Sequence, residues 1–531
     1  MDLSAAVHQW QLLLGPAQVL LNDAAMAAYG SDTGGAVRRV PAALRVLDGA
    51  YLQEVMRIAS RHQVPVYPIS TGNNWGYGSA LPPRDDCVIL DLSALTKVLD
   101  FDEEFGVVTL EPGVTQGMLA HFLDAGNYPY MVPVTGAGPN CSVVGNALER
   151  GYGITPHVDH FGAVTDLEAV LPDGNLYRTA LREAGGQELA RLFKWGIGAY
   201  STGLFTQGGF GIVTRMSIVL QRKPECINVC FFGLRDDSLL EPTIQAIRSI
   251  LVKLPGTVGG INLMNQHRVL SMSAPFPVNQ LGEDGLIDPS VIQQLGQQYK
   301  VLPWTGFGTL YGTDRVVAAA RREIRAALSE VASRLYFFTP SRARALRSIA
   351  RWLPGTTGKR VSSMADKLAQ SLELVAGKPN EMALPLAYWR YPKAQQDTFK
   401  NPSRDGSGLL WYAPLVPMRA RDVRQYVDMV KRITYKYRME PLITFTSIND
   451  RLFDSTVPLL FDRDQSTAVT SAQTCYNELL DAGRAQGWFP YRVGIDNMRR
   501  LASLQPYSSA FHARLRKGLD PHDLMAPGRY R

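Results

Sequence analysis

Apolar residues recur with two different periods between Met1 and Glu225. The spacing in AYLQEVMRIASRHQ (50–63) and GMLAHFLDAG (117–126) is that of amphipathic helices, and we also expect residues 4–30 to be helical. DLEAVLPDGNLYRT (166–179) predicts a hairpin that turns at Pro172-Asp173-Gly174-Asn175. Strands are predicted in five further segments: 39–47, 64–70, 82–93, 105–114 and 211–225. This part of the chain therefore has an α+β order.

From Cys226 onward the pattern changes to alternating longer helices and strands. VVAAARREIRAALSEVASRLY (316–336) predicts one long helix because it is rich in strong helix formers. The C-terminal segment is expected to be helical and then to end in a tail that contains proline and glycine. Loop-like inserts are expected at three places, 273–290, 354–362 and 399–408.

Composition indicates a globular protein with more than one domain. With 531 residues, the chain is too long for one ordinary core. Its residues are 46% hydrophobic and 19% charged, which is typical of a globular protein. Its 55 basic residues are scattered among 48 acidic ones, and the dense cluster RARALRSIARW (342–352) is typical of a solvated helix face, so we expect no nucleic-acid partner. Five cysteines give no disulfide framework. Neither an apolar run long enough to span a membrane nor a signal peptide is found, which favours a cytoplasmic protein without a membrane partner.

Glycine-rich segments carry the first chemical signal. The candidates GYGSAL, GAGPNC, GYGITP and GIGAYS each lack the third glycine of a dinucleotide fingerprint, and GTTGKR is no P-loop. HExxH, GxSxG and paired CxxC motifs are absent, so the sequence predicts neither a metal site nor a serine nucleophile. Four glycine-rich turns remain, at 70–78, 134–146, 150–156 and 206–213, and together they favour an extended, phosphate-containing cofactor because glycine lets backbone N–H groups approach an anion.

Five segments resemble the 4-phenol-oxidising FAD flavoproteins, the family of vanillyl-alcohol oxidase, eugenol oxidase and the p-cresol methylhydroxylase flavoprotein subunit. They are PISTGNNWGYG (68–78), VVGNALERGYGITPHVDHFGAVTDLEAVLPDGNLYRT (143–179), WGIGAYSTGLFTQGGFGIVTRM (195–216), GWFPYRV (487–493) and LDPHDLMAPGRY (519–530). The resemblance implies an α+β fold in which a two-subdomain FAD-binding domain carries an inserted α+β cap domain. We expect the FAD domain at 1–224 and 486–531, the cap at 225–485, and a homodimer.

The resemblance also assigns residues to FAD. The loop STGNNWG would surround the pyrophosphate with main-chain donors, and its ordering cost would then be offset by the bound cofactor. Trp75 in this loop is expected to serve packing only. The residues expected to contact FAD are Ser70, Thr71, Gly72, Asn73, Asn74, Gly76, Pro133, Thr135, Gly136, Ser142, Gly145, Asn146, Gly151, Gly153, Gly211, Ile212, Val213 and Arg529.

Four residues are expected to carry the chemistry. Tyr77, Tyr491 and Arg492 match the family trio that holds a phenolic oxygen, and Arg529 matches an arginine beside the flavin N1–C2 carbonyl region. The resemblance thus implies an FAD-dependent oxidase or dehydrogenase that takes a hydride from the benzylic carbon of a para-substituted phenol, through a phenolate and a quinone methide. Two alternatives stay open: oxidation of another hydroxylated small molecule, and a flavin-binding scaffold without turnover.

Three departures from the family pattern matter. Leu409 and the pair Asn73-Asn74 stand where the family attaches its flavin, so FAD is expected to be bound non-covalently. Val134 replaces an aspartate near flavin N5. The cap residues that match the family's acid and histidines are Thr444, Phe453 and Asp454, of which Asp454 is either a substitute base or an ordinary salt-bridged aspartate.

Other partners follow less directly from the sequence. The substrate is expected to be a small aromatic molecule, and the reduced flavin would pass its electrons to oxygen or to a redox protein. His157, His160 and Asp159 in TPHVDH are expected to be packed turn residues rather than catalysts.

Overall fold

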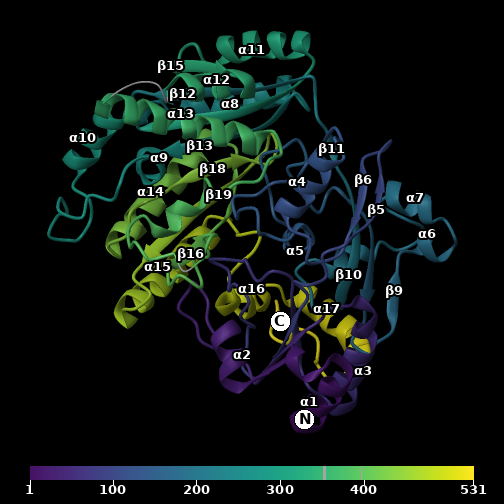
Figure 1. Ribbon diagram of the computed structural model, residues 1–531. Coiled ribbons are helices and arrows are strands. Elements are labelled where there is room, and N and C mark those ends of the chain that lie inside the picture. Colours follow the sequence, from purple (N-terminus) through teal and green to yellow (C-terminus); the bar gives the residue numbers. More distant parts are fainter. Residues whose placement is uncertain (351–354, 396) are drawn as a thin grey trace.

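The computed structural model describes residues 1–350, 355–395 and 397–531, and its N-terminal part is a four-stranded sheet covered by helices (Figure 1). The strand order is β1-β2-β4-β3, with β2 and β3 both parallel to β4. Trp10 and Met56 pack against Leu44 in the core below this sheet. The elements are α1 (Leu3–Leu14), β1 (Val19–Leu21), α2 (Asn22–Tyr29), β2 (Ala42–Arg45), α3 (Leu52–His62), β3 (Val66–Ile69) and β4 (Val88–Asp91).

A five-stranded antiparallel sheet follows, in the order β5-β6-β10-β8-β9. Its inner face packs on α4 and α5, where Leu119 and Val144 meet Val108 and Met216. A short ribbon pairs β7 with β11. The elements are β5 (Val98–Asp102), β6 (Val107–Leu110), α4 (Gln116–Ala125), β7 (Tyr130–Met131), α5 (Val143–Leu148), β8 (Val164–Val170), β9 (Leu176–Arg178), α6 (Ala180–Glu183), α7 (Gln187–Leu192), β10 (Ile212–Val219) and β11 (Gln221–Arg222).

The third sheet is drawn entirely from residues 226–461, in the order β15-β12-β14-β13-β18-β19-β16, with β17 paired to β19. Its helices α8, α11, α14 and α15 cover one face, because every second residue of β12 and β13 is apolar and buried against them. The elements are β12 (Cys226–Leu234), α8 (Leu240–Lys253), β13 (Val258–Asn265), α9 (Gln266–Ser273), α10 (Pro289–Tyr299), β14 (Trp304–Gly312), α11 (Asp314–Leu328), β15 (Arg334–Phe338), α12 (Pro340–Ala350), α13 (Gly355–Val375), β16 (Gly408–Tyr412), β17 (Leu415–Pro417), α14 (Ala420–Lys436), β18 (Thr444–Ser447), β19 (Leu452–Phe461) and α15 (Ser466–Ala485).

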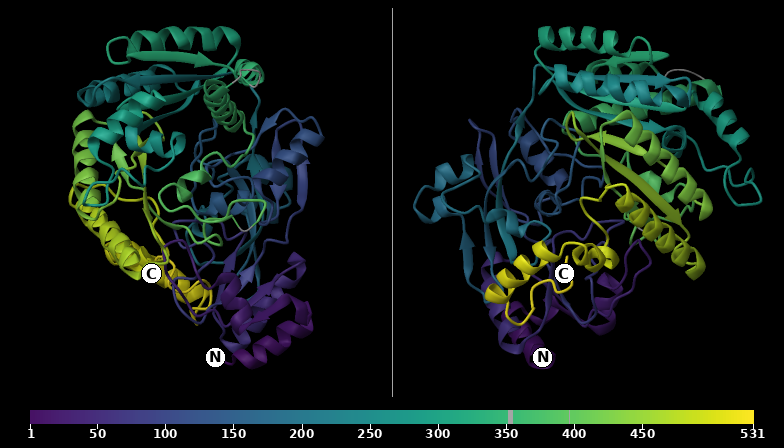
Figure 2. Two further views of the ribbon diagram at one scale, coloured as in Figure 1. Left: turned by 60° about the vertical axis from the view of Figure 1, so that its left-hand side comes forward. Right: turned by 180° about the vertical axis from the view of Figure 1, so that it is seen from behind.

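The C-terminal segment returns to the first sheet. After α16 (Met498–Ser503) and α17 (Pro506–Leu519), the tail runs beside β3, where the Val66 amide donates to the Leu524 carbonyl at 2.8 Å and the Ala526 amide donates to the Val66 carbonyl at 2.8 Å. Figure 2 shows the yellow C-terminal helices lying against the purple N-terminal elements. No helix within the described ranges is long and apolar enough to cross a membrane.

Several predicted elements need correction. Residues 4–30 are two helices separated by β1, because Gly15 and Pro16 end the first one. The helix predicted over 316–336 ends at Leu328, and the aromatic-rich Arg334–Phe338 becomes β15 on the edge of the third sheet. The strand predicted over 211–225 is divided into β10 and β11, which pair with different partners. In the insert predicted at 354–362, residues 355–362 begin α13 instead, and residue 354 lies outside the described residues.

Candidate active site

A cavity of about 1240 Å³ lies between the loops of the first two sheets and the uncovered face of the third. Loop 70–75 and the turns around residues 135, 145 and 151 form one wall, and residues of β13, β18 and β19 form the opposite wall. The volume exceeds that of a typical small-ligand pocket, so the cavity can hold a large cofactor and a substrate together.

The loop after β3 presents free backbone donors to this cavity. The amides of residues 71–75 donate to no acceptor within the described part of the chain, whereas the next amide, that of Gly76, donates to Thr33 Oγ1 at 2.7 Å. Gly72 has a φ of +67°, a conformation that lets successive amides point toward one concave surface. Such a row of unpaired amides at a cavity wall fits the diphosphate of FAD.

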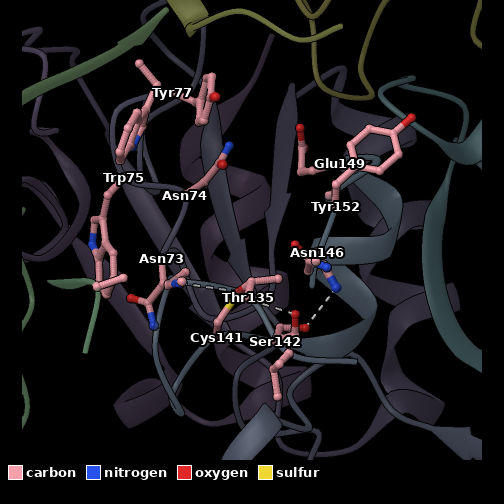
Figure 3. Close-up of a pocket in the computed structure, with 18 of the residues that line it drawn as sticks. Asn73, Asn74, Trp75, Tyr77, Thr135, Cys141, Ser142, Asn146, Glu149 and Tyr152 are labelled. Carbon is pink, nitrogen blue, oxygen red and sulfur yellow. Dashed lines mark hydrogen bonds between the residues drawn. The ribbon is translucent and has the colours of Figure 1, made fainter. Parts of the chain in front are cut away.

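A second turn packs closely against this loop. A Cβ added to Gly145 would lie 2.3 Å from Ser70 Oγ, so a larger residue here would displace the Ser70 side chain from its place between α5 and the loop. Ser142 caps α5 by accepting from the Gly145 amide at 2.9 Å and itself donates to the Pro112 carbonyl at 2.6 Å. Figure 3 shows Asn73, Thr135 and Ser142 near one end of the cavity and Tyr77, Glu149 and Tyr152 near the other.

Most residues predicted to contact FAD line this cavity. Two of them, Gly76 and Pro133, are absent from the lining. Gly76 instead packs against Trp411, and a Cβ at this position would lie 2.2 Å from the indole. The predicted residues that do line it are Ser70, Thr71, Gly72, Asn73, Asn74, Thr135, Gly136, Ser142, Gly145, Asn146, Gly151, Gly153, Gly211, Ile212, Val213 and Arg529.

Arg529 is buried in the wall rather than solvated at a frayed end. It donates to Glu149 Oε1 in an ion pair and to the Tyr67 hydroxyl at 3.0 Å. Burial is the largest single effect and lowers the pKa of Arg529, but Glu149 together with the hydroxyls of Tyr67 and Tyr530 raises the pKa above its usual value. The guanidinium is therefore held permanently charged and in one orientation at the cavity surface.

Tyr77, Tyr491 and Arg492 are brought together from opposite ends of the chain. The Arg492 guanidinium carbon lies 4.0 Å from the ring centre of Tyr77 and 5.5 Å from that of Tyr491. The Tyr152 ring packs edge-on against Tyr491 at 5.2 Å. Burial raises the pKa of both Tyr77 and Tyr491 although Arg492 opposes it, so their hydroxyls stay protonated and can donate to an anion.

The third sheet contributes a row of polar side chains. Thr446 of β18 lies opposite Asp454 of β19, and Thr444 lies opposite Thr456, so these four side chains share the cavity face while Phe445 and Phe453 point into the core. Asp454 Oδ1 has no hydrogen-bond partner, and no ion pair to Asp454 is found in the parts of the chain that are described. Burial raises the pKa of Asp454 to about 7, against a smaller lowering by Arg492. The interpretation of Asp454 as an ordinary salt-bridged residue is therefore wrong.

The remaining sequence hypotheses concern attachment and packing. Leu409, Asn73 and Val134 all line the cavity at the positions where the resemblance would place a flavin attachment or a carboxylate. Trp75 packs in a hydrophobic cluster and donates to Asn401 Oδ1 at 3.2 Å, which is a structural role. His160 is buried against Asn146, and burial lowers its pKa to about 3, so it stays neutral as a packed residue.

Among the cavity residues that the sequence reasoning missed, Glu149 and Arg268 matter most for charge. Glu149 stands between Asn146 and Gly151, both predicted to contact FAD, so its place in the chain was a usable signal. Arg268 lies in α9 and reaches the cavity beside Thr444. Nothing local marks Arg268, because its position depends on how β13 pairs with β18.

Comparison with known proteins agrees with an FAD-binding fold. Residues 41–180 match the family model described as an FAD binding domain. The chain is 33% identical over 530 residues to 1'-carboxy-chondrochloren decarboxylase of Chondromyces crocatus, a match that covers 99% of this chain and 97% of that protein. It is 27% identical over 533 residues to the 4-cresol dehydrogenase (hydroxylating) flavoprotein subunit of Pseudomonas putida, covering 99% and 95%.

The fold is also similar to a solved structure over nearly its whole length. The structure of p-cresol methylhydroxylase with substrate bound superimposes with a TM-score of 0.86 at 26% identity, covering 99% of this chain and 96% of that one.

Proposed function

The chain belongs to the 4-phenol-oxidising FAD flavoproteins, and on that premise we propose that it takes a hydride from the benzylic carbon of a para-substituted phenol. It is an FAD-dependent oxidoreductase, either an oxidase or a dehydrogenase. The observation that carries the proposal is the cluster at the cavity wall in which the Arg492 guanidinium carbon lies 4.0 Å from the ring centre of Tyr77 and 5.5 Å from that of Tyr491.

This cluster suits a phenolate. A phenol has a pKa of about 10 in water, and an adjacent guanidinium with two hydroxyl donors favours its anion, each pKa unit being worth about 1.4 kcal/mol. The phenolate releases electron density through the ring toward the para carbon, which assists the departure of a hydride and leaves a quinone methide. FAD, when bound, supplies the acceptor for these two electrons.

The other residues have supporting roles. The amides of loop 71–75 would hold the diphosphate, and the Arg529–Glu149 pair would place a fixed cation at the cavity wall. Asp454 is proposed as the proton acceptor of the site because it is buried, faces Arg492 and has an unused oxygen.

The cofactor would be bound without a covalent link. Leu409 and Asn73 occupy the usual attachment positions, and no histidine lines the cavity among the residues that the structure describes. We also propose that 1–224 and 486–531 form the FAD domain and 225–485 the cap, since the third sheet comes only from 226–461. A homodimer and a cytoplasmic location remain part of the proposal.

Anaerobic titration tests the main proposal. The FAD-loaded protein is mixed with a panel of 4-alkylphenols, and bleaching of the oxidised flavin is followed. Bleaching by at least one phenol but not by its O-methyl ether is expected, since the ether cannot form a phenolate. If no phenol bleaches the flavin, oxidation of another hydroxylated small molecule is favoured instead. Stopped-flow reoxidation with oxygen then distinguishes oxygen from a redox protein as the acceptor.

A second candidate function is oxidative decarboxylation, because a relative 33% identical over the whole chain is named a decarboxylase. For a phenol with a CH2–CHR–COO⁻ side chain, the benzylic carbon loses a hydride to the flavin. The C–C bond to the carboxylate then breaks, CO2 leaves, and its electron pair forms the new C=C bond and returns charge to the phenolate oxygen. The products are an alkene, CO2 and reduced flavin. Release of one CO2 per flavin reduced supports this function, and reduction without CO2 excludes it.

A further inference from the structure

Arg268 is a buried cation that faces the cavity and has no acidic partner among the residues that the structure describes. Its residue exposure is 8%, its Nε donates to Thr444 Oγ1 at 3.2 Å, and its Nη1 donates to Ser271 Oγ at 3.4 Å. Burial lowers the pKa of Arg268 to about 10, which still leaves it charged at neutral pH. Across the described ranges no carboxylate forms an ion pair with it.

Its situation differs from that of Arg529. Both arginines are buried and line the cavity. Arg529 is neutralised by Glu149, whereas the partners of the Arg268 guanidinium in the described part of the chain are two hydroxyls. A guanidinium has five donors, and a buried charge costs several kcal/mol unless an anion compensates it. The unused donors and the uncompensated charge are therefore available to an anion that enters the cavity.

The register of the third sheet locates this anion relative to the phenol site. Asp454, which faces Arg492, lies opposite Thr446 of β18. Two residues away on the same strand, Thr444 accepts a hydrogen bond from Arg268. Two residues of a strand span about 7 Å. Arg268 thus marks the end of the polar row that begins beside the phenol-binding cluster.

The diphosphate is not the anion that this position calls for. The unpaired amides that suit it lie in loop 71–75 after β3, whereas Arg268 lies on α9 at the wall formed by the third sheet. A planar guanidinium matches a carboxylate through paired hydrogen bonds. Resting on the proposed function, we infer that Arg268 binds a carboxylate carried by the para side chain of the phenolic substrate, and so determines the substrate class.

The test uses ligands that bind without being oxidised. 4-Hydroxyphenoxyacetate has oxygen at the benzylic position, so it has no hydride to lose, and 4-hydroxyphenoxyacetamide is its neutral counterpart. Affinities for the FAD-loaded protein are measured by calorimetry. The acid is expected to bind at least about tenfold more tightly than the amide, equivalent to about 1.4 kcal/mol.

Arg268→Met should abolish that preference, with the affinity for the amide changed by less than about threefold. Arg268→Lys should keep part of it, because the charge remains but the paired geometry is lost. Lys367→Met is the matched control: Lys367 is another cation at the cavity, it donates to the Met272 carbonyl at 2.8 Å, and its removal should leave the preference for the acid intact.

Each opposite result is decisive. Equal binding of acid and amide by the unaltered protein overturns the inference without any variant. If Arg268→Met binds FAD more weakly but, once loaded with FAD, still prefers the acid to the amide, Arg268 contacts the cofactor and not the substrate carboxylate. The phenol proposal fails separately, if Tyr491→Phe weakens neither ligand while the acid preference persists.

Discussion

Replacing Asp454 with asparagine should separate the chemical role of this carboxyl from its structural cost. Asp454 is 5% exposed, and its Oδ1 has no hydrogen-bond partner among the described residues. Burial raises its pKa from 3.8 to about 7. Asparagine has the same shape and cannot ionise, so the substitution removes the titration and adds little new strain.

The sign of the stability effect follows from the two pKa values. Between pH 3.8 and about 7 the native state holds a proton that the unfolded state has lost, so stability falls as the pH rises through this window and is constant above it. At about 1.4 kcal/mol per pKa unit, this difference in proton binding lowers the stability by about 2 kcal/mol at pH 5, where the native carboxyl is still protonated, and by about 4 kcal/mol at pH 8, where it is ionised. Asp454→Asn should therefore be more stable than the unaltered protein, and more so at pH 8 than at pH 5.

The effect on turnover should have the opposite direction. If Asp454 accepts a proton, the rate of anaerobic flavin reduction rises with pH through an apparent pKa of about 7, and Asp454→Asn loses this step and is slower by about 10²–10⁴. Thermal unfolding and stopped-flow reduction at matched pH values measure the two effects.

Asp32 provides the control for these measurements. It is also buried, with burial raising its pKa to about 6, but it does not line the cavity. Asp32→Asn should retain the step in reduction rate. Two results would refute this role of Asp454. One is that Asp454→Asn reduces its flavin as fast as the unaltered protein and with the same pH profile. The other is that the stability gain of Asp454→Asn over the unaltered protein is smaller at pH 8 than at pH 5.

Three further predictions concern the other walls of the cavity. Arg492→Met should slow phenol-driven flavin reduction by at least about a hundredfold while FAD stays bound, as measured by stopped flow, because the phenolate loses its guanidinium. Gly145→Ala should weaken FAD binding by about tenfold or more in a fluorescence titration, since its Cβ would meet Ser70 Oγ at 2.3 Å, whereas Gly518→Ala, with open space around it, should not. Glu149→Gln should destabilise the FAD-free protein by about 3 kcal/mol or more in denaturant unfolding, because Arg529 is left buried without its anion; an unchanged midpoint would contradict this.

The sequence predicted those parts of the site that depend on local chain geometry. Loop 70–75 could be recognised because its glycines and the preceding strand are contiguous, and a row of free amides needs only local torsion angles. Tyr491 and Arg492 were found through the resemblance alone. A Tyr-Arg pair carries no signal of its own, and its partner Tyr77 lies near the other end of the chain.

The surroundings of two cavity residues could not be derived from local sequence, because they depend on tertiary pairing. Arg268 and Asp454 reach the cavity because of strand register, and a shift of one residue in β18 would turn Thr444 and Thr446 away from it. The prediction of one helix over 316–336 was wrong for a related reason. Its last residues are stabilised more by pairing with β12 as an edge strand than by continuing the helix.

The balance of charge in the substrate end of the cavity constrains what can bind there. Arg492 and Arg268 are two cations at this end. Among the described acids here, Glu149 is already paired with Arg529, whereas Asp454 has no ion pair and is only partly ionised near neutral pH. A neutral alkylphenol that forms a phenolate would compensate Arg492 and leave Arg268 unmatched. A phenol with a carboxylate on its side chain would compensate both, and the charged Asp454 would then be repelled and pushed toward its protonated form. Proton uptake by Asp454 on binding is thus a direct consequence of a doubly charged substrate, and it links the two arginines to the acid between them.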